Sequence, residues 1–146
     1  MPPSIHDNFL VSYEVRCKER TITLRTEYDY EDRPQEFTNV VFTGVQGYRF
    51  EDDAFGNIIY GLDEVPVEQI LEEHHAQIAE SYHMAGAPGP WAANLESAAA
   101  FLTAQGAKGF VLSSSYGLSG WVIAREVSIH HAQPSVPADA PQAAPR

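Results

Sequence analysis

The sequence has little cysteine, little positive charge and no long apolar run. Its 146 residues include one cysteine, Cys17, so no intramolecular disulfide can form, and this fits a reducing compartment. No apolar run approaches the roughly 18 residues that a membrane-spanning helix needs. The N-terminus lacks the basic and apolar regions of a signal peptide. From these absences we expect a cytoplasmic protein.

Basic residues are scarce in this chain. Nine Lys and Arg stand against 20 Asp and Glu, which gives a formal net charge of -11. Such a field repels nucleic acid and anionic membrane surfaces, so we expect neither as a partner. Solubility alone explains an acidic excess, but the same charge would also steer a basic protein toward this one. A basic protein partner is therefore kept as a hypothesis.

Motifs that identify a cofactor or a catalytic site are also absent. No glycine-rich phosphate-binding fingerprint occurs, so the sequence indicates no cofactor. Ser119 follows Gly117 as in a nucleophile elbow, but the next glycine, Gly120, comes one position too early and a strand rather than a helix follows. A β-hairpin loop is the simpler interpretation, and no catalytic residue is predicted.

What the chain does contain is a series of alternating apolar and polar residues, which predicts strands. The predicted strands cover residues 9–17, 20–28, 37–45, 48–50, 58–62, 110–114 and 121–129. In the first strand, the side chains predicted to face the core are Phe9, Val11, Tyr13, Val15 and Cys17. Gly44 and Gly47 favour a sharp change of direction, and Gly56 and Asn57 suit positive φ in the next turn.

Two amphipathic helices are predicted between the strands. Pro66 begins the first, and its apolar face comprises Val67, Ile70, Leu71, His74, Ile78 and Tyr82. The second runs from Asn94, the predicted N-cap, to Gln105. Residues 1–8 are read as an extension and 132–146 as a disordered Ala/Pro-rich tail. The sequence predicts one α+β domain over 9–131, an antiparallel sheet of about six or seven strands with two inserted helices packed on one face.

The sharpest charge cluster lies in a predicted turn at Glu51, Asp52 and Asp53. With Asn57 it offers oxygens to a hard cation, but the spacing differs from that of a calcium loop. A solvated hairpin tip is the simplest interpretation, and a protein-binding patch is the functional one. Aromatic residues add to that patch if they are exposed; Trp91 is a further such candidate. The predicted partner-binding residues are Glu51, Asp52, Asp53, Phe55, Tyr116 and Trp121.

The most site-like cluster in the sequence, a group of histidines and carboxylates, lies on the first helix. Glu72 and His75 have the i, i+3 spacing of di-iron carboxylate bundles, and His83 lies two turns further on. Such a site needs a second pair and two more carboxylates on facing helices, which this chain does not supply. A solvated helix surface is therefore the simpler interpretation, and Glu72, His75 and His83 are weak metal-ligand candidates.

Three segments, residues 40–45, 55–59 and 115–121, resemble those of an uncharacterised family of small bacterial proteins. In overall build the chain is similar to the acidic immunity proteins of bacterial toxin systems. That resemblance implies an inhibitor that docks on a basic toxin, and it implies no functional residue by position. Three hypotheses stay open: a protein-binding module of the immunity type, a metal-dependent or small-molecule-binding protein using the helix Glu and His residues, and a homo-oligomer, such as a homodimer, that buries its last strand against a second copy.

Overall fold

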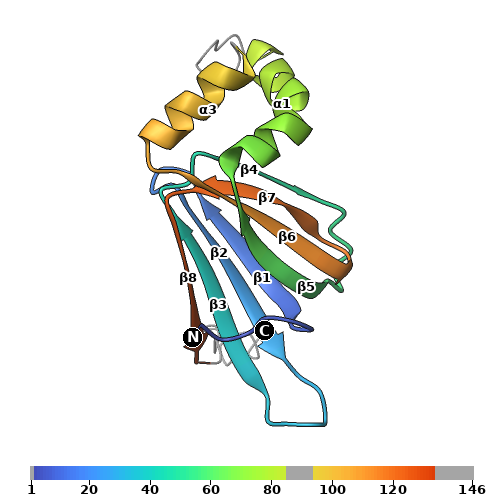
Figure 1. Ribbon diagram of the computed structural model, residues 1–146. Coiled ribbons are helices and arrows are strands. Elements are labelled where there is room, and N and C mark those ends of the chain that lie inside the picture. The colour runs from blue at the N-terminus through green and yellow to red at the C-terminus, as the bar shows by residue number, and fades with distance from the viewer. Residues whose placement is uncertain (1, 85–93, 134–146) are drawn as a thin grey trace, which may run out of the picture.

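The computed structural model describes residues 2–84 and 94–133 and shows an antiparallel sheet with two helices (Figure 1). The strands are β1 (Phe9–Arg16), β2 (Thr21–Tyr28), β3 (Glu36–Thr43), β4 (Gly47–Glu51), β5 (Ile58–Val65), β6 (Lys108–Tyr116), β7 (Ser119–Ala124) and β8 (Glu126–Ala132). Their order across the sheet is β4-β7-β6-β5-β1-β2-β3-β8. Helices α1 (Val67–Met84) and α3 (Leu95–Ala104) lie between β5 and β6 in the chain. The predicted α+β class is therefore confirmed.

The sheet turns a corner where β3 leads into β4 and β7 leads into β8. β3 pairs with β8, and β4 pairs with β7, so both chain segments bend at the same place. The Arg125 N–H donates to the Thr43 carbonyl at 3.1 Å, and the Gln46 N–H donates to the Ile123 carbonyl at 2.7 Å. Gly44 has φ of 63°, and a Cβ there would lie 2.9 Å from the Arg125 side chain. The predicted last strand is divided at this corner, and the sheet therefore has eight strands.

The sheet has two halves, β4-β7-β6-β5 and β1-β2-β3-β8. Their inner faces enclose the main core. The rings of Phe42 on β3 and Phe110 on β6 lie 5.5 Å apart, so each half supplies an aromatic ring to the centre. Around them lie buried aliphatic residues of both halves: Leu10, Ile22, Leu24, Val40, Val45, Ile59, Leu112, Leu118 and Val122. Ile5, from the predicted N-terminal extension, is buried in the same core. Residues 5–8 are held there by backbone hydrogen bonds that link Asp7 and Asn8 to Ile59.

A β-bulge in β1 overturns part of the predicted inward face. The register with β2 shifts between Leu10 and Ser12, so the alternation changes sides at Val11. Leu10, which was predicted to point outward, is buried, and Val11 is 55% exposed. Beyond the bulge, Tyr13 and Val15 lie opposite the buried Leu24 and Ile22, on the predicted side, although Tyr13 is still 39% exposed. Cys17, predicted to be a core residue, lies just beyond the strand and is exposed. The prediction was wrong at Leu10 and Val11 because a period of two holds only while the strand has no extra residue. It was wrong at Cys17 because the strand ends at Arg16.

The helices cover the outer face of β6 and β7 (Figure 1). Side chains of α1 and α3 form a second core with Trp121 and Ile123 of β7, while the neighbouring Val122 and Ala124 belong to the first core. β7 is thus buried on both faces. The predicted face of α1 is confirmed at Val67, Ile70, Leu71 and Ile78, which are all buried. Within residues 2–84 and 94–133, no helix is long and apolar enough to cross a membrane.

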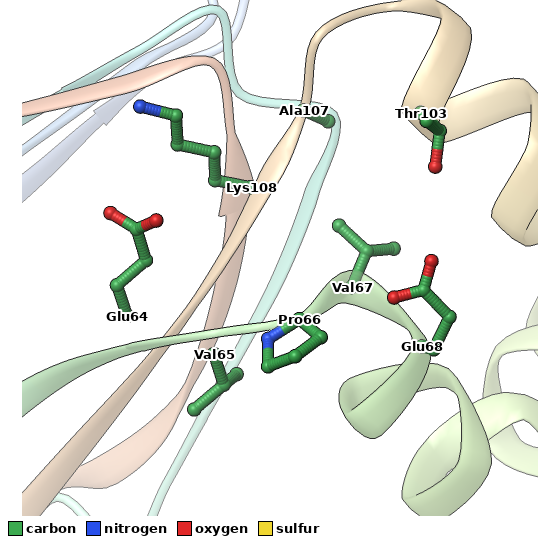
Figure 2. Close-up of a pocket in the computed structure, with 8 residues that line it drawn as sticks. All are labelled: Glu64, Val65, Pro66, Val67, Glu68, Thr103, Ala107 and Lys108. Atoms are coloured by element: carbon green, nitrogen blue, oxygen red, sulfur yellow. The ribbon is translucent and has the colours of Figure 1, made fainter.

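The α3 N-terminus is capped as the sequence predicts. The side chain of Asn94 accepts a hydrogen bond from the Ser97 N–H at 2.8 Å, which satisfies one of the free amides of the first turn. At the base of the helix pair, where β5 passes into α1 and Ala107 leads into β6, lies a cleft of about 370 Å³ (Figure 2). Figure 2 shows Glu64 and Lys108 on one side of this cleft and Glu68 and Thr103 on the other.

Candidate functional site

The acidic turn between β4 and β5 is fixed by Asn57, which is only 4% exposed. Its Oδ1 accepts hydrogen bonds from the Ala54 N–H at 2.9 Å and the Leu118 N–H at 2.8 Å. Its Nδ2 donates to Asp53 Oδ1 at 2.9 Å. A Cβ at Gly117 would overlap Asn57 Oδ1, so glycine at that position allows the close approach. One amide side chain therefore joins the acidic turn to the β6–β7 turn, 61 residues away in sequence.

The backbone of the turn differs from the sequence prediction. Positive φ occurs at Asp52 (65°) and Phe55 (61°), and not at Gly56 or Asn57 as predicted. The Phe55 N–H donates to Asp53 Oδ1 at 2.9 Å, which is an Asx turn that holds Phe55 in the left-handed region. The Phe55 ring is 96% exposed. The turn therefore presents a phenyl ring to solvent on a backbone fixed by side-chain hydrogen bonds.

Aromatic residues of β1, β4 and β6 lie beside the turn. The Tyr13 hydroxyl on β1 donates to Asp53 Oδ2 at 2.9 Å. The Tyr13 ring lies 5.8 Å from that of Phe50 on β4, and Phe50 lies 5.4 Å from Tyr48. Tyr13 and Tyr48 are both exposed, at 39% and 43%. Tyr116, which is 59% exposed, pairs with Ile58 directly after the turn.

We call these residues together the acidic–aromatic surface. It comprises Glu51, Asp52, Asp53, Phe55, Tyr13, Tyr48 and Tyr116. Five of them were predicted from the sequence as partner-binding residues. Tyr13 and Tyr48 were not, because Tyr13 was assigned to the core and Tyr48 to an ordinary strand. The role of Asn57 could have been suspected from the Asp53-to-Asn57 spacing, since Asx side chains often bond within their own turn.

Trp121 does not belong to this surface. It is 6% exposed and lies in the second core, where the His74 ring of α1 stacks on it with a centroid distance of 5.8 Å. Trp121 was predicted to bind a partner only if it is exposed, and it is buried. Trp91, named on the same condition, lies outside the described residues.

The metal-ligand candidates of α1 do not form a cluster in the described part of the chain. Glu72 is exposed and His75 is half-buried, while the side chain of His83 lies outside the described residues. Among residues 2–84 and 94–133, no three His, Cys, Asp or Glu side chains come together as a metal ion would require.

Asp53 and Tyr13 carry shifted pKa values that make the turn sensitive to pH. Hydrogen bonds from Asn57 Nδ2, the Phe55 N–H and the Tyr13 hydroxyl lower the pKa of Asp53 below its ordinary value of 3.8. The hydrogen bond to Asp53 raises the pKa of Tyr13 above its ordinary value of 10.0, and partial burial adds to this rise. Each shift stabilises the ionisation state in which Tyr13 donates to a charged Asp53.

Replacement of Tyr13 by Phe is expected to remove the pH effect of Tyr13 and the part of the Asp53 effect that the Tyr13 hydroxyl causes, while the larger parts from Asn57 and Phe55 remain. A lowered folded-state pKa stabilises the fold above the unfolded value, so the contribution of Asp53 is lost as pH falls below 3.8 through the lower folded value. A raised pKa stabilises below the unfolded value, so the contribution of Tyr13 is lost as pH rises above 10.0 through the higher folded value. Urea midpoints of wild type and Tyr13→Phe should therefore differ most at pH 7 and converge at both extremes.

The matched control for this measurement is Tyr60→Phe. Tyr60 is 61% exposed, and among the described residues its hydroxyl makes no hydrogen bond. The urea midpoint of Tyr60→Phe should equal that of the wild type at every pH. Tyr28, whose pKa is raised by its hydrogen bond to Asp32, titrates in both proteins and cancels in the difference. If the difference in urea midpoint between wild type and Tyr13→Phe did not change with pH, the hydrogen bond from Tyr13 to Asp53 would not have the expected effect on the two pKa values.

No protein-family model, curated protein or solved structure matches this chain. The function is therefore argued from the geometry of the described residues.

Proposed function

We propose that this chain is a non-enzymatic protein-binding module of the immunity or inhibitor type, acting in the cytoplasm. It would bind a basic protein through the acidic–aromatic surface. The observation that carries the proposal is Phe55, whose ring is 96% exposed on a residue with φ of 61°. Glu51, Asp52 and Asp53 lie in the same turn, and the exposed rings of Tyr13, Tyr48 and Tyr116 lie on strands next to it.

An exposed phenyl ring on a left-handed residue is unfavourable for the isolated domain. The left-handed conformation costs about 1–2 kcal/mol for a residue with a Cβ, and leaving a phenyl ring in water forgoes about 2 kcal/mol of burial. The hydrogen bonds of Asp53 and Asn57 nevertheless hold the turn in this form. A rigid aromatic side chain in a preformed turn loses little entropy on binding, and this is typical of a residue that dominates an interface.

The charges of the turn support a basic partner. Glu51 is paired with Arg49 on the same strand at 2.7 Å, whereas Asp52 makes no ion pair within the described ranges. Asp53 accepts its hydrogen bonds from uncharged donors, so its negative charge is not neutralised. Two exposed carboxylates beside an apolar ring complement a surface with Lys or Arg residues around an apolar pocket.

The test begins with capture of partners from lysate of the native host at low and at high salt. We expect one stoichiometric basic protein, released at high salt because screening weakens exposed charge pairs. With that partner purified, Phe55→Ala should weaken binding by about 30-fold or more, as truncation of a central aromatic residue costs at least about 2 kcal/mol. Binding unchanged by Phe55→Ala would refute the proposed surface.

The charge component is tested separately with Asp52→Asn. Asparagine tolerates the left-handed backbone at this position, and Asp52 makes no side-chain hydrogen bond among the described residues, so the fold should be unaffected. We expect slower association and a weaker dependence on salt. Glu72→Gln on α1 removes the same charge from an exposed helix position and should leave association unchanged. Equal effects of the two variants would mean that net charge, and not this surface, directs binding.

A second candidate function is a homo-oligomer, and the position of β8 favours it. β8 lies at one edge of the sheet, and among the described strands it pairs only with β3. Its other edge is available to a second copy, because unpaired strand edges readily add another strand. Light scattering at micromolar concentration decides between the candidates: a dimer mass would support this one, and a monomer mass would exclude it.

A further inference from the structure

A second cleft lies between α1 and the outer face of β6 and β7, and it shares only Glu51 with the acidic–aromatic surface. Its volume is about 340 Å³, within the usual range for small-molecule sites. Its apolar wall is formed by Ile70 of α1 and Val111 of β6 with Trp121. Its polar wall comprises Arg49, Glu51, Gln69, Glu73, His74, Ser113 and Ser119.

Trp121 provides the first sign of a ligand site. The residue is 6% exposed, and its indole Nε1 is fully covered without a hydrogen-bond partner among the described residues. Buried N–H groups almost always have an acceptor, because an unpaired donor loses its hydrogen bond to water and gains nothing. A donor left without an acceptor beside a cleft is therefore a group that a bound molecule could satisfy.

His74 stacks on this indole. Its ring stacks on Trp121 with an interplanar angle of 29°, and its side chain is 33% exposed. Its ion-pair contact, at 3.6 Å, is with Glu73, which is 61% exposed. Rotation of the imidazole about its own side-chain bonds would uncover the indole without displacing a core residue.

Arg49 provides a charged donor next to Trp121. The two residues are opposite each other on β4 and β7, so their side chains lie on the same face of the sheet. Arg49 uses only its Nε for Glu51, at 2.7 Å, which leaves the terminal guanidinium nitrogens available. An arginine fork is suited to a carboxylate, and the nearby serine hydroxyls can donate as well.

We propose that this cleft binds a small organic carboxylate with a flat apolar body. The carboxylate accepts hydrogen bonds from the Arg49 guanidinium and Trp121 Nε1, and the body lies against Ile70 and Val111. The cleft of Figure 2 is a weaker candidate. Like the proposed cleft, it has two carboxylates, Glu64 and Glu68, and one basic residue, but none of its side chains contains a buried polar atom without a partner.

The experiment follows the indole N–H resonances of the full-length protein by ¹⁵N NMR. Trp91 and Trp121 give two such resonances, and Trp91→Phe assigns them. Three probes share a phenyl ring and differ in charge: benzoate, benzamide and benzylamine. We expect benzoate to move the Trp121 resonance downfield in a saturable way, with a Kd of about 1 to 10 mM for so small a molecule. Benzamide should bind more weakly, and benzylamine should cause no saturable shift.

Variants test each donor. Arg49→Gln should weaken benzoate binding at least about tenfold and change benzamide binding little, since the arginine pairs with charge. Trp121→Phe keeps the ring but lacks the N–H, and ligand-observed NMR should show weaker binding of benzoate and benzamide alike. If Trp121→Phe does not fold, His74→Ala provides the second test, because it uncovers the indole and should strengthen benzoate binding.

Two control variants test whether benzoate binds in this cleft and not elsewhere on the protein. Arg33→Gln removes an arginine that lies over Tyr28, away from the cleft, and should leave benzoate binding unchanged. Phe55→Ala should also leave benzoate binding unchanged. A failure of the cleft proposal can therefore be distinguished from a failure of the proposed protein partner. The absence of any saturable shift, or shifts of equal size with benzoate and benzylamine, would overturn the inference.

Discussion

Replacement of Asn57 by Ala is expected to lower the free energy of unfolding by about 3 kcal/mol. The variant loses three side-chain hydrogen bonds, to Ala54, Leu118 and Asp53, each worth about 1 kcal/mol. It also leaves the buried Leu118 N–H without its acceptor, which adds to the cost. For a chain of this length such a loss lowers Tm by roughly 6–12 °C, measured by calorimetry.

The same substitution should abolish partner binding, because the acidic turn is joined to the β6–β7 turn through Asn57. Asn57→Asp separates the acceptor role from the donor role. It keeps an oxygen for Ala54 and Leu118 but places a second carboxylate against Asp53, so it should be destabilised at pH 7 and partly recover at acid pH.

Asn39→Ala is the matched control. Asn39 lies within β3, and its side chain makes no hydrogen bond to any described residue. Its substitution should change stability by no more than about 0.5 kcal/mol. If Asn57→Ala stayed within about 1 kcal/mol of the wild type, Asn57 would not be the residue that fixes the turn.

Gly120→Ala is expected to cost about 3–5 kcal/mol, the largest effect that we expect from the addition of a single methyl group. A Cβ at Gly120 would overlap the carbonyl oxygen of Arg49 and lie 3.0 Å from the Phe50 Cα. Both contacts are with backbone atoms, so no side-chain rotation relieves them. β4 must move away from β7, and β4 carries Tyr48, Phe50 and the start of the acidic turn.

Hydrogen exchange provides the specific readout for this variant. Amides of β4 should exchange faster than in the wild type, while those of β2 and β3 should lose protection only as far as global stability falls. Gly61→Ala is the control, because nothing lies within 4 Å of a Cβ at that position in β5. It should be neutral or slightly stabilising, since alanine restricts the unfolded chain. Equal destabilisation by the two substitutions would argue against a backbone clash at Gly120.

The local features of this fold follow from the sequence. The β1–β2 hairpin, the buried face of α1 and the Asn94 cap depend on residues a few positions apart, and periodicity and capping chemistry report such spacings directly. The corner at Gly44 was also predicted, because only a residue without a Cβ easily bends the chain there. For the candidate site, the sequence identified the acidic turn and Phe55 but not what holds them in place.

The tertiary structure decided the features that depend on residues far apart in the chain. The bulge at Val11 turns Leu10 into the core, and the fold brings Tyr13 beside Asp53, 40 residues later. Trp121 is buried because α1 covers the outer face of β7, and no local pattern distinguishes a strand covered on both faces from an exposed apolar one. Asn57 bonds to Leu118 across 61 residues. Sequence periodicity reports which way neighbouring side chains point, whereas burial and side-chain hydrogen bonding depend on which distant segments come to lie against them.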